Sequence, residues 1–163
     1  MNKNKLKQFV NALDMLSDDV KDWGVKMEST KEPTCGTPGC HAGLISIVAK
    51  DLPGLEEAHL KVFKIHFKTY KEIKQDLYVY TIWADALAEF LGFEDILHLT
   101  DWAVDNPKLW GNKYGDYMFC GRRAFTDDTD DKSKQLTHRD IINHWKQVLK
   151  KVEEEGVKND EQR

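Results

Sequence analysis

Two cysteines and a histidine share one short run and are the side chains of this sequence best suited to chemistry. Cys35, Cys40 and His41 belong to the run CGTPGCHAG, in which Thr37 and Pro38 predict the start of a helix. The N–H groups of a first helical turn and the positive end of the helix dipole favour a thiolate. Cys35 or Cys40 could therefore act as a nucleophile, with His41 or a distant histidine as the base.

Two other interpretations of the same residues stay open. Together with Cys120, they supply the ligand types that zinc prefers. However, the spacing of Cys35, Cys40 and His41 matches no usual zinc motif, and adjacent residues point about 100° apart on a helix. In the structural interpretation, small thiols and neighbouring glycines only allow a tight turn. No histidine has an evident orienting partner in sequence, so the pattern favours a protein that is not an enzyme.

The segment that follows the cysteines is the most apolar in the chain. From Ala42 to Ala49 only Ser46 is polar, and a helix that is apolar on nearly all sides belongs in an interior. The sequence thus predicts a buried central helix over residues 38–50, around which the other helices pack.

Apolar residues at three- and four-residue steps predict the other helices. These helices cover residues 3–16, 55–80, 81–92, 96–106 and 137–156, and a short turn begins at Ser17. Residues 60–80 also fit a strand, and helix is the interpretation preferred. Residues 23–27 predict a brief extended segment. We expect a mainly α fold: a single compact domain of five to six helices over residues 1–156, with a polar tail at 157–163.

Residues 107–126 are predicted to form a loop rich in glycine and aromatic side chains. A loop with so many large apolar groups should fold back on the core, and long ordered loops often carry function. We expect it to cover the start of the central helix, so that any ligand pocket lies between the two. The candidate ligand-binding residues are Thr37, Trp110, Asn112, Tyr114, Asp116 and Arg122. The alternative is a loop that only completes packing.

A stripe of lysines follows helical spacing through the segment 55–80. Its members are Lys61, Lys64, Lys68, Lys71 and Lys74. The simplest interpretation is a solvated flank, because the net charge of the chain is −4. The alternative is contact with an acidic partner, and the stripe is the only hint of nucleic-acid binding in the chain.

The overall composition is that of an ordinary globular protein. The chain has 163 residues, of which 40% are hydrophobic and 32% charged, with three cysteines and no apolar run of transmembrane length. Three cysteines do not make a secreted disulfide framework. We expect a cytoplasmic protein without membrane contact, and with no cofactor unless the zinc interpretation holds.

Several short motifs resemble one protein family. The run CGTPGCHAG at 35–43 is followed by LWGN at 109–112, MF at 118–119 and AF at 124–125. This pattern resembles a family of small uncharacterised phage and bacterial proteins that share a CGTxxCxAG helix start and a W-x-N…M-F…A-F loop. The resemblance implies no established activity.

The function expected from these features is a non-enzymatic binding or interaction module, phage-encoded and acting on a host protein or a small anionic ligand. The alternatives are a thiol-dependent enzyme that uses Cys35 or Cys40, and a zinc-binding protein.

Overall fold

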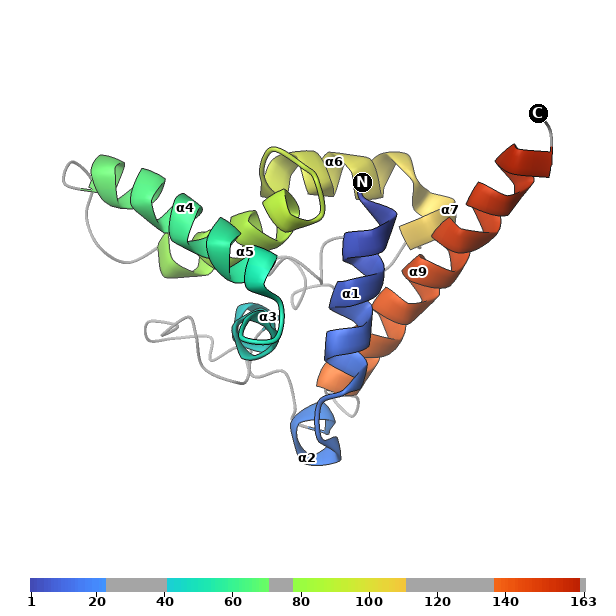
Figure 1. The fold of residues 1–163 in the computed structure, drawn as a ribbon, viewed down its shortest axis with the longest axis horizontal. Helices are drawn as coiled ribbons and strands as arrows, with labels where there is room; N and C mark the ends of the chain where they lie inside the picture. The colour runs from blue at the N-terminus through green and yellow to red at the C-terminus, as the bar shows by residue number, and fades with distance from the viewer. Residues whose placement is uncertain (23–40, 71–77, 111–136, 162–163) are drawn as a thin grey trace, which may run out of the picture.

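The computed structural model describes residues 1–22, 41–70, 78–110 and 137–161, and every element in these ranges is a helix (Figure 1). The helices are α1 (Lys3–Asp14), α2 (Asp18–Lys21), α3 (His41–Ala49), α4 (Pro53–Tyr70), α5 (Tyr78–Phe90), α6 (Ile96–Asp105), α7 (Pro107–Trp110) and α9 (His138–Glu161). The prediction of a mainly α fold is confirmed. The predicted extended segment at 23–27 lies outside the described residues.

The helix α3 lies at the centre of the described fold. It contacts α1, α4, α5 and α9, and Leu44, Ile45 and Val48 are at most 1% exposed. Ser46 and Ile47 are half-buried, and the Ser46 hydroxyl donates a hydrogen bond to the Gly43 carbonyl over 2.7 Å. The predicted central helix is therefore present from His41 to Ala49, and its predicted first residues, 38–40, are outside the described ranges.

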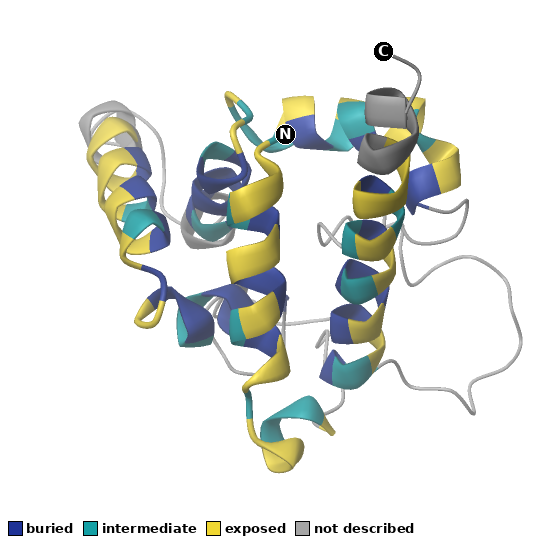
Figure 2. Ribbon diagram, turned by 45° about the vertical axis from the view of Figure 1, so that its right-hand side comes forward, coloured by how far each residue is buried: buried dark blue, intermediate teal, exposed yellow. Residues whose placement is uncertain are grey.

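Helices α1 and α9 pack side by side and turn their buried sides toward each other and α3 (Figure 2). On α1 the buried residues Leu6, Phe9 and Leu13 recur at three- and four-residue steps. Asn2 caps this helix, because its side-chain oxygen accepts a hydrogen bond from the Lys5 N–H. The Asn2 N–H also donates to the Leu91 carbonyl over 2.7 Å, which ties the start of α1 to the end of α5.

The predicted single helix over 55–80 is wrong in both its length and its orientation. α4 begins at Pro53 and ends at Tyr70, and α5 begins at Tyr78, so Thr81 lies inside α5 and does not cap it. Leu60 and Phe63 are among the apolar residues whose spacing predicts this helix, but these side chains are 50% and 44% exposed. The residues that α4 buries are Leu55, Ala58 and Val62, and Leu52 directly before the helix is buried as well. Counting only large apolar side chains missed this face, because Ala58 lets α4 approach the alanine-rich α5 closely.

Gly92 ends α5 through its backbone conformation. Its φ is +90°, in the left-handed region that side chains with a Cβ rarely adopt. The Phe93 N–H donates to the Ala88 carbonyl and the Gly92 N–H to the Glu89 carbonyl, which is the pair of bonds of a Schellman motif. The predicted helix stop at Gly92 is thus present, and it directs the chain into α6.

Replacing Gly92 with alanine is expected to lower the free energy of unfolding by about 1–2 kcal/mol, as measured by urea denaturation. A Cβ at this position would meet Asn2 atoms only at 3.5 and 3.6 Å, so the cost comes from the backbone and not from a clash. The matched control is Gly54→Ala in α4, whose Cβ would lie 3.4 Å from the Phe90 ring, and which should be neutral or slightly stabilising. Equal losses in both variants would contradict this explanation.

The sequence predicted the start of the last helix, α9, but not its end. At its start, Thr137 and Asp140 form a capping box: the Thr137 N–H donates to the Asp140 carboxylate over 2.9 Å, and the Asp140 N–H donates to the Thr137 hydroxyl over 3.4 Å. At its end, the predicted stop at Gly156 is wrong, because α9 continues to Glu161. A glycine inside a helix costs only about 1 kcal/mol relative to alanine, so it does not by itself end a helix. Most of the predicted tail 157–163 is therefore helical.

Candidate functional site

The described ends of the two predicted pocket walls meet at Trp145 of α9. His41 opens α3 directly after the cysteine run, and Trp110 closes α7 directly before the predicted glycine-rich loop. The ring centroids of His41 and Trp145 are 6.4 Å apart, and those of Trp110 and Trp145 are 4.9 Å apart. The sequence placed Trp110 in a loop, whereas residues 107–110 form the short helix α7, because Pro107 suits a first helical position.

The other candidate residues of this site are not placed by the structure. These are Cys35, Thr37, Cys40, Asn112, Tyr114, Asp116, Cys120 and Arg122, which all lie outside the described residues. The nucleophile and zinc hypotheses therefore stay predictions. Of the candidate zinc ligands only His41 is described, and the distant histidines His98, His138 and His144 can also be examined as bases.

The His41 side chain is 3% exposed and faces the indole of Trp145. The Trp145 Nε1–H donates a hydrogen bond to His41 Nε2 over 3.4 Å. Because an indole N–H can only donate, Nε2 must accept, and the imidazole in this contact is neutral with its proton on Nδ1. This contact joins the start of α3 to the middle of α9 and gives His41 a structural role.

We call the buried contacts of His41, Trp110, His144 and Trp145 between α3, α7 and α9 the seam. Two further histidines, His138 and His144, are buried on α9. His144 is 8% exposed and its ring meets the Trp110 ring edge-on at 4.9 Å. Burial, and secondarily the charge of Lys151, lowers the pKa of His144 from 6.5 to about 4. An imidazole with such a low pKa is a weak general base near neutral pH. His138 is fully buried, and its pKa is also lowered, mainly by burial.

His138 and His144 are core residues that their polarity concealed in the sequence, although their spacing indicates a buried position. His138 precedes Ile141 by three residues, and His144 follows Ile141 by three and precedes Val148 by four. They therefore belong to the apolar stripe of α9. The helical spacing thus indicates core positions for both residues, although histidine is polar.

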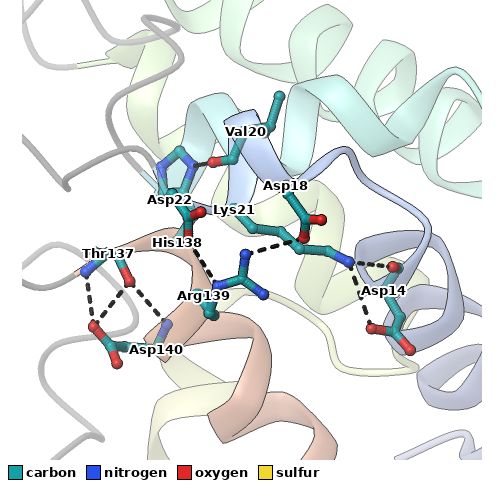
Figure 3. Close-up of polar contacts among 9 residues, drawn as sticks. All are labelled: Asp14, Asp18, Val20, Lys21, Asp22, Thr137, His138, Arg139 and Asp140. Carbon is teal, nitrogen blue, oxygen red and sulfur yellow. Dashed lines mark hydrogen bonds and ion pairs between the residues drawn. The ribbon is translucent and has the colours of Figure 1, made fainter.

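A group of charged residues joins α2 to α9 at the other end of the seam (Figure 3). The Arg139 guanidinium donates to Asp22 over 2.7 Å and to Asp18 over 3.0 Å, while His138 Nδ1 donates to the Val20 carbonyl over 3.2 Å. The hydrogen bond from Arg139 lowers the pKa of Asp22. These ion pairs are exposed, so each contributes little free energy. Together these contacts connect α2 to the start of α9.

The outer side of α4 is different, because it exposes large apolar side chains among charged ones. We define the α4 outer face as Glu57, Leu60, Lys61, Lys64 and Ile65, which line one shallow depression. Leu60 is 50% and Ile65 56% exposed. Figure 2 shows the exposed side of this helix turned away from the rest of the molecule.

The α4 outer face is held firmly on α5. The Lys61 ammonium pairs with the Glu89 carboxylate of α5 at 2.6 Å. Beside it, the His59 ring stacks on the Trp83 ring with centroids 3.7 Å apart, and the Phe63 ring lies 6.4 Å from His59. Lys61 and Lys64 of the predicted lysine stripe are therefore placed. Lys68 lies in α4 without a described side chain, and Lys71 and Lys74 lie outside the described ranges.

The described residues also bear on the predicted zinc site and on the expectation of no membrane contact. In the described part of the chain, no group of three or more His, Cys, Asp or Glu side chains could hold a metal ion. Among the same residues, no helix combines the length and the apolar character needed to cross a bilayer.

The described fold and surfaces define a small helical protein with a buried tryptophan–histidine seam and one exposed basic and apolar helix face. No protein-family model, curated protein or solved structure matches the chain. The resemblance to small phage and bacterial proteins thus stays a prediction based on its motifs.

Proposed function

We propose that this protein is a non-enzymatic interaction module that binds an acidic helix of another protein through the α4 outer face. The observation that carries the proposal is the exposure of Leu60 and Ile65 beside two lysines, on a helix whose other side is packed against α5. Exposed apolar side chains with a charged rim are typical of protein interaction sites.

The sign of charge on this face indicates the kind of partner. The net charge of the chain is −4, whereas the α4 outer face carries Lys61 and Lys64 against one carboxylate, Glu57, and Lys61 is also paired with Glu89 of α5. An overall negative charge disfavours binding to nucleic acid, which depends on contacts with many phosphates. An amphipathic helix with carboxylates beside its apolar stripe could pack its apolar side chains on Leu60 and pair its carboxylates with the lysines of the face.

The residues with chemical potential in the described ranges support a binding function more than an enzymatic one. His41, His138 and His144 are buried between helices, and the Asp85 carboxylate accepts a hydrogen bond from the Ile96 N–H over 3.0 Å. Each of these side chains joins two helices. The thiol-dependent and zinc-binding alternatives rest on cysteines outside the described residues and stay hypotheses. From the motif resemblance we expect a phage or bacterial protein whose partner is a host component.

A photo-crosslinking amino acid at Leu60 tests this proposal in the cells that make the protein. We expect an adduct with one protein, through a segment that carries carboxylates and apolar residues at helical spacing. Lys64→Glu should abolish this adduct. The matched control Lys108→Glu, which makes the same charge change at an exposed site on α7, should leave it intact. The position control is Met15, which is 87% exposed at the end of α1. Equal adducts from both positions, or an adduct with nucleic acid, would contradict the proposal.

A further inference from the structure

The exposed side of α4 is acidic near its start and basic further along. Glu56 and Glu57 come first, Lys61 and Lys64 follow one to two turns later, and all four side chains are exposed. Leu60, which is 50% exposed, lies between the two ends. Residues three, four and seven apart share one side of a helix, so Glu57, Leu60 and Lys64 form one row. The charge of this row changes sign across Leu60.

A row of this kind complements a second copy of itself only when the two helices run antiparallel. A parallel pair would place Glu57 opposite Glu57 and Lys64 opposite Lys64, and like charges across an interface are unfavourable. An antiparallel pair about a twofold axis near Leu60 places Glu57 of each copy opposite Lys64 of the other. The same contact then forms twice through one face, as an isologous interface requires.

Apolar side chains lie where the two helices would cross. Leu60 is at the middle of the row, and Leu60 and Ile65 line the shallow depression of the α4 outer face. Phe63 and Ile65 are 44% and 56% exposed on the same helix. The twofold axis brings the two Leu60 side chains together, and removal of these apolar groups from water favours association.

The remaining charge of the face is already compensated within the chain. The Lys61 ammonium pairs with the Glu89 carboxylate of α5 at 2.6 Å. Glu57 and Lys64 are therefore the charges of the α4 outer face that decide how two copies pair.

Helix α4 lies at one edge of the described fold, where a second copy can reach it. Its inner side packs on α5, and its exposed side is turned away from the other helices (Figures 1 and 2). The helix has 18 residues and is about 27 Å long. A single pair of such helices falls among the weak, transient interfaces, which bury less than ~1,200 Å² in total. The pair should therefore form and separate readily.

We propose that the α4 outer faces of two copies of this chain pair antiparallel, with Glu57 of each copy opposite Lys64 of the other and the two Leu60 side chains in contact. The inference rests on the proposed function in one respect, because it adds regulation of the same face. Self-pairing covers the surface that the partner helix needs, so a chain in the dimer does not bind the partner. The partner has to displace the second copy.

Sedimentation velocity on a dilution series of the purified chain, up to about 1 mM, tests the pairing. The mass of the wild type should rise with concentration from its single-chain value of 18.9 kDa. Glu57→Lys makes both ends of the row basic and Lys64→Glu makes both acidic, so each variant alone should associate at least about tenfold more weakly. The double variant Glu57→Lys/Lys64→Glu exchanges the two charges and should associate like the wild type.

Two controls separate this result from general charge effects. Lys108→Glu on α7 and Glu155→Lys on α9 make the same charge changes at exposed positions on other helices, and should associate like the wild type. Circular dichroism confirms that each variant is folded. A wild type that stays monomeric at every concentration overturns the inference. A double variant that associates no better than the single variants does so too, because the row would then not be pairing with itself.

The photo-crosslinking amino acid at Leu60 keeps this inference distinct from the proposed function. A monomeric wild type that forms the Leu60 adduct with an acidic helix of another protein would overturn the self-pairing and leave the proposed function standing. A dimer with the expected charge dependence, whose Leu60 forms adducts with a second copy alone, would support the self-pairing and contradict the proposed function.

Discussion

Replacing Trp145 with alanine is expected to lower the free energy of unfolding by about 3–5 kcal/mol, the usual cost of removing a fully buried tryptophan. Trp145 is 0% exposed, and among the described residues it contacts three other aromatic rings. Phe9 meets its ring edge-on at 5.3 Å and Trp110 does so at 4.9 Å, while His41 stacks on it at 6.4 Å. These rings come from α1, α7 and α3, so the substitution removes the contact that α9 shares with all three helices. Urea denaturation followed by far-UV circular dichroism measures the loss.

The matched variant is Trp145→Phe, which keeps an aromatic ring but removes the N–H that donates to His41. Its expected cost is smaller, about 1–2 kcal/mol, from the lost hydrogen bond and part of the lost packing. Trp83→Ala provides a second comparison, because Trp83 is only half-buried and should cost less than Trp145. A loss below about 1 kcal/mol for Trp145→Ala would contradict the central place of this side chain in the seam.

Acidification from pH 7 to about pH 4.5 is expected to lower the free energy of unfolding by about 2–3 kcal/mol through His144. Burial lowers the pKa of this residue to about 4 in the folded chain, against 6.5 when exposed. The unfolded chain therefore binds the proton more readily, so the stability is present above pH 6.5 and is lost as the pH falls toward 4. The lowered pKa of His138 acts in the same direction.

Other titrating groups act in different ways or at lower pH. The pKa of the exposed His98 is raised, first by its hydrogen bond to Asp95, so its contribution is present at low pH and offsets part of the loss. The pKa values of Asp14, Asp22 and Asp95 are lowered below 3.8, so their stabilisation persists down to about pH 4. Between pH 7 and 4.5, the free energy of unfolding therefore responds to the shifted pKa values of the histidines and hardly to those of these three aspartates.

Urea denaturation at several pH values measures this dependence, with His144→Gln as the test variant. Glutamine does not titrate, so the stability of this variant should fall less between pH 7 and 4.5 than that of the wild type. His98→Gln is the matched control at an exposed site and should remove only the opposing contribution, which steepens the fall. Parallel pH profiles for the wild type and His144→Gln would show that His144 does not cause the loss.

Much of the fold was predictable because apolar residues in this chain follow the helical period. The central helix followed from the run after the cysteines, and the capping residue Thr137 marks a helix start that the structure contains. The prediction failed where small or polar residues take core positions. Ala58 replaces Leu60 on the buried side of α4, and His144 joins the core stripe of α9.

The candidate site was less predictable than the fold, for a physical reason. The sequence predicted that the loop 107–126 covers the start of the central helix; of these two segments the structure describes His41 and Trp110, whose rings both lie against the indole of Trp145. It could not indicate that Trp145, more than a hundred residues after His41, lies between them. The apolar spacing of residues 96–106 also includes Leu97, which is 68% exposed, because an exposed apolar residue has the same hydropathy as a buried one.

The tryptophan seam also gives this protein a built-in optical reporter. The indoles of Trp102, Trp110 and Trp145 follow one another with centroids 6.1 and 4.9 Å apart, and each pair is nearly perpendicular. The environment of each indole therefore depends on the position of its neighbour. A displacement of α9 would change the surroundings of Trp145 and Trp110, and with them the intrinsic fluorescence and near-UV dichroism of these two rings. Motions of the seam can therefore be followed in the unlabelled protein.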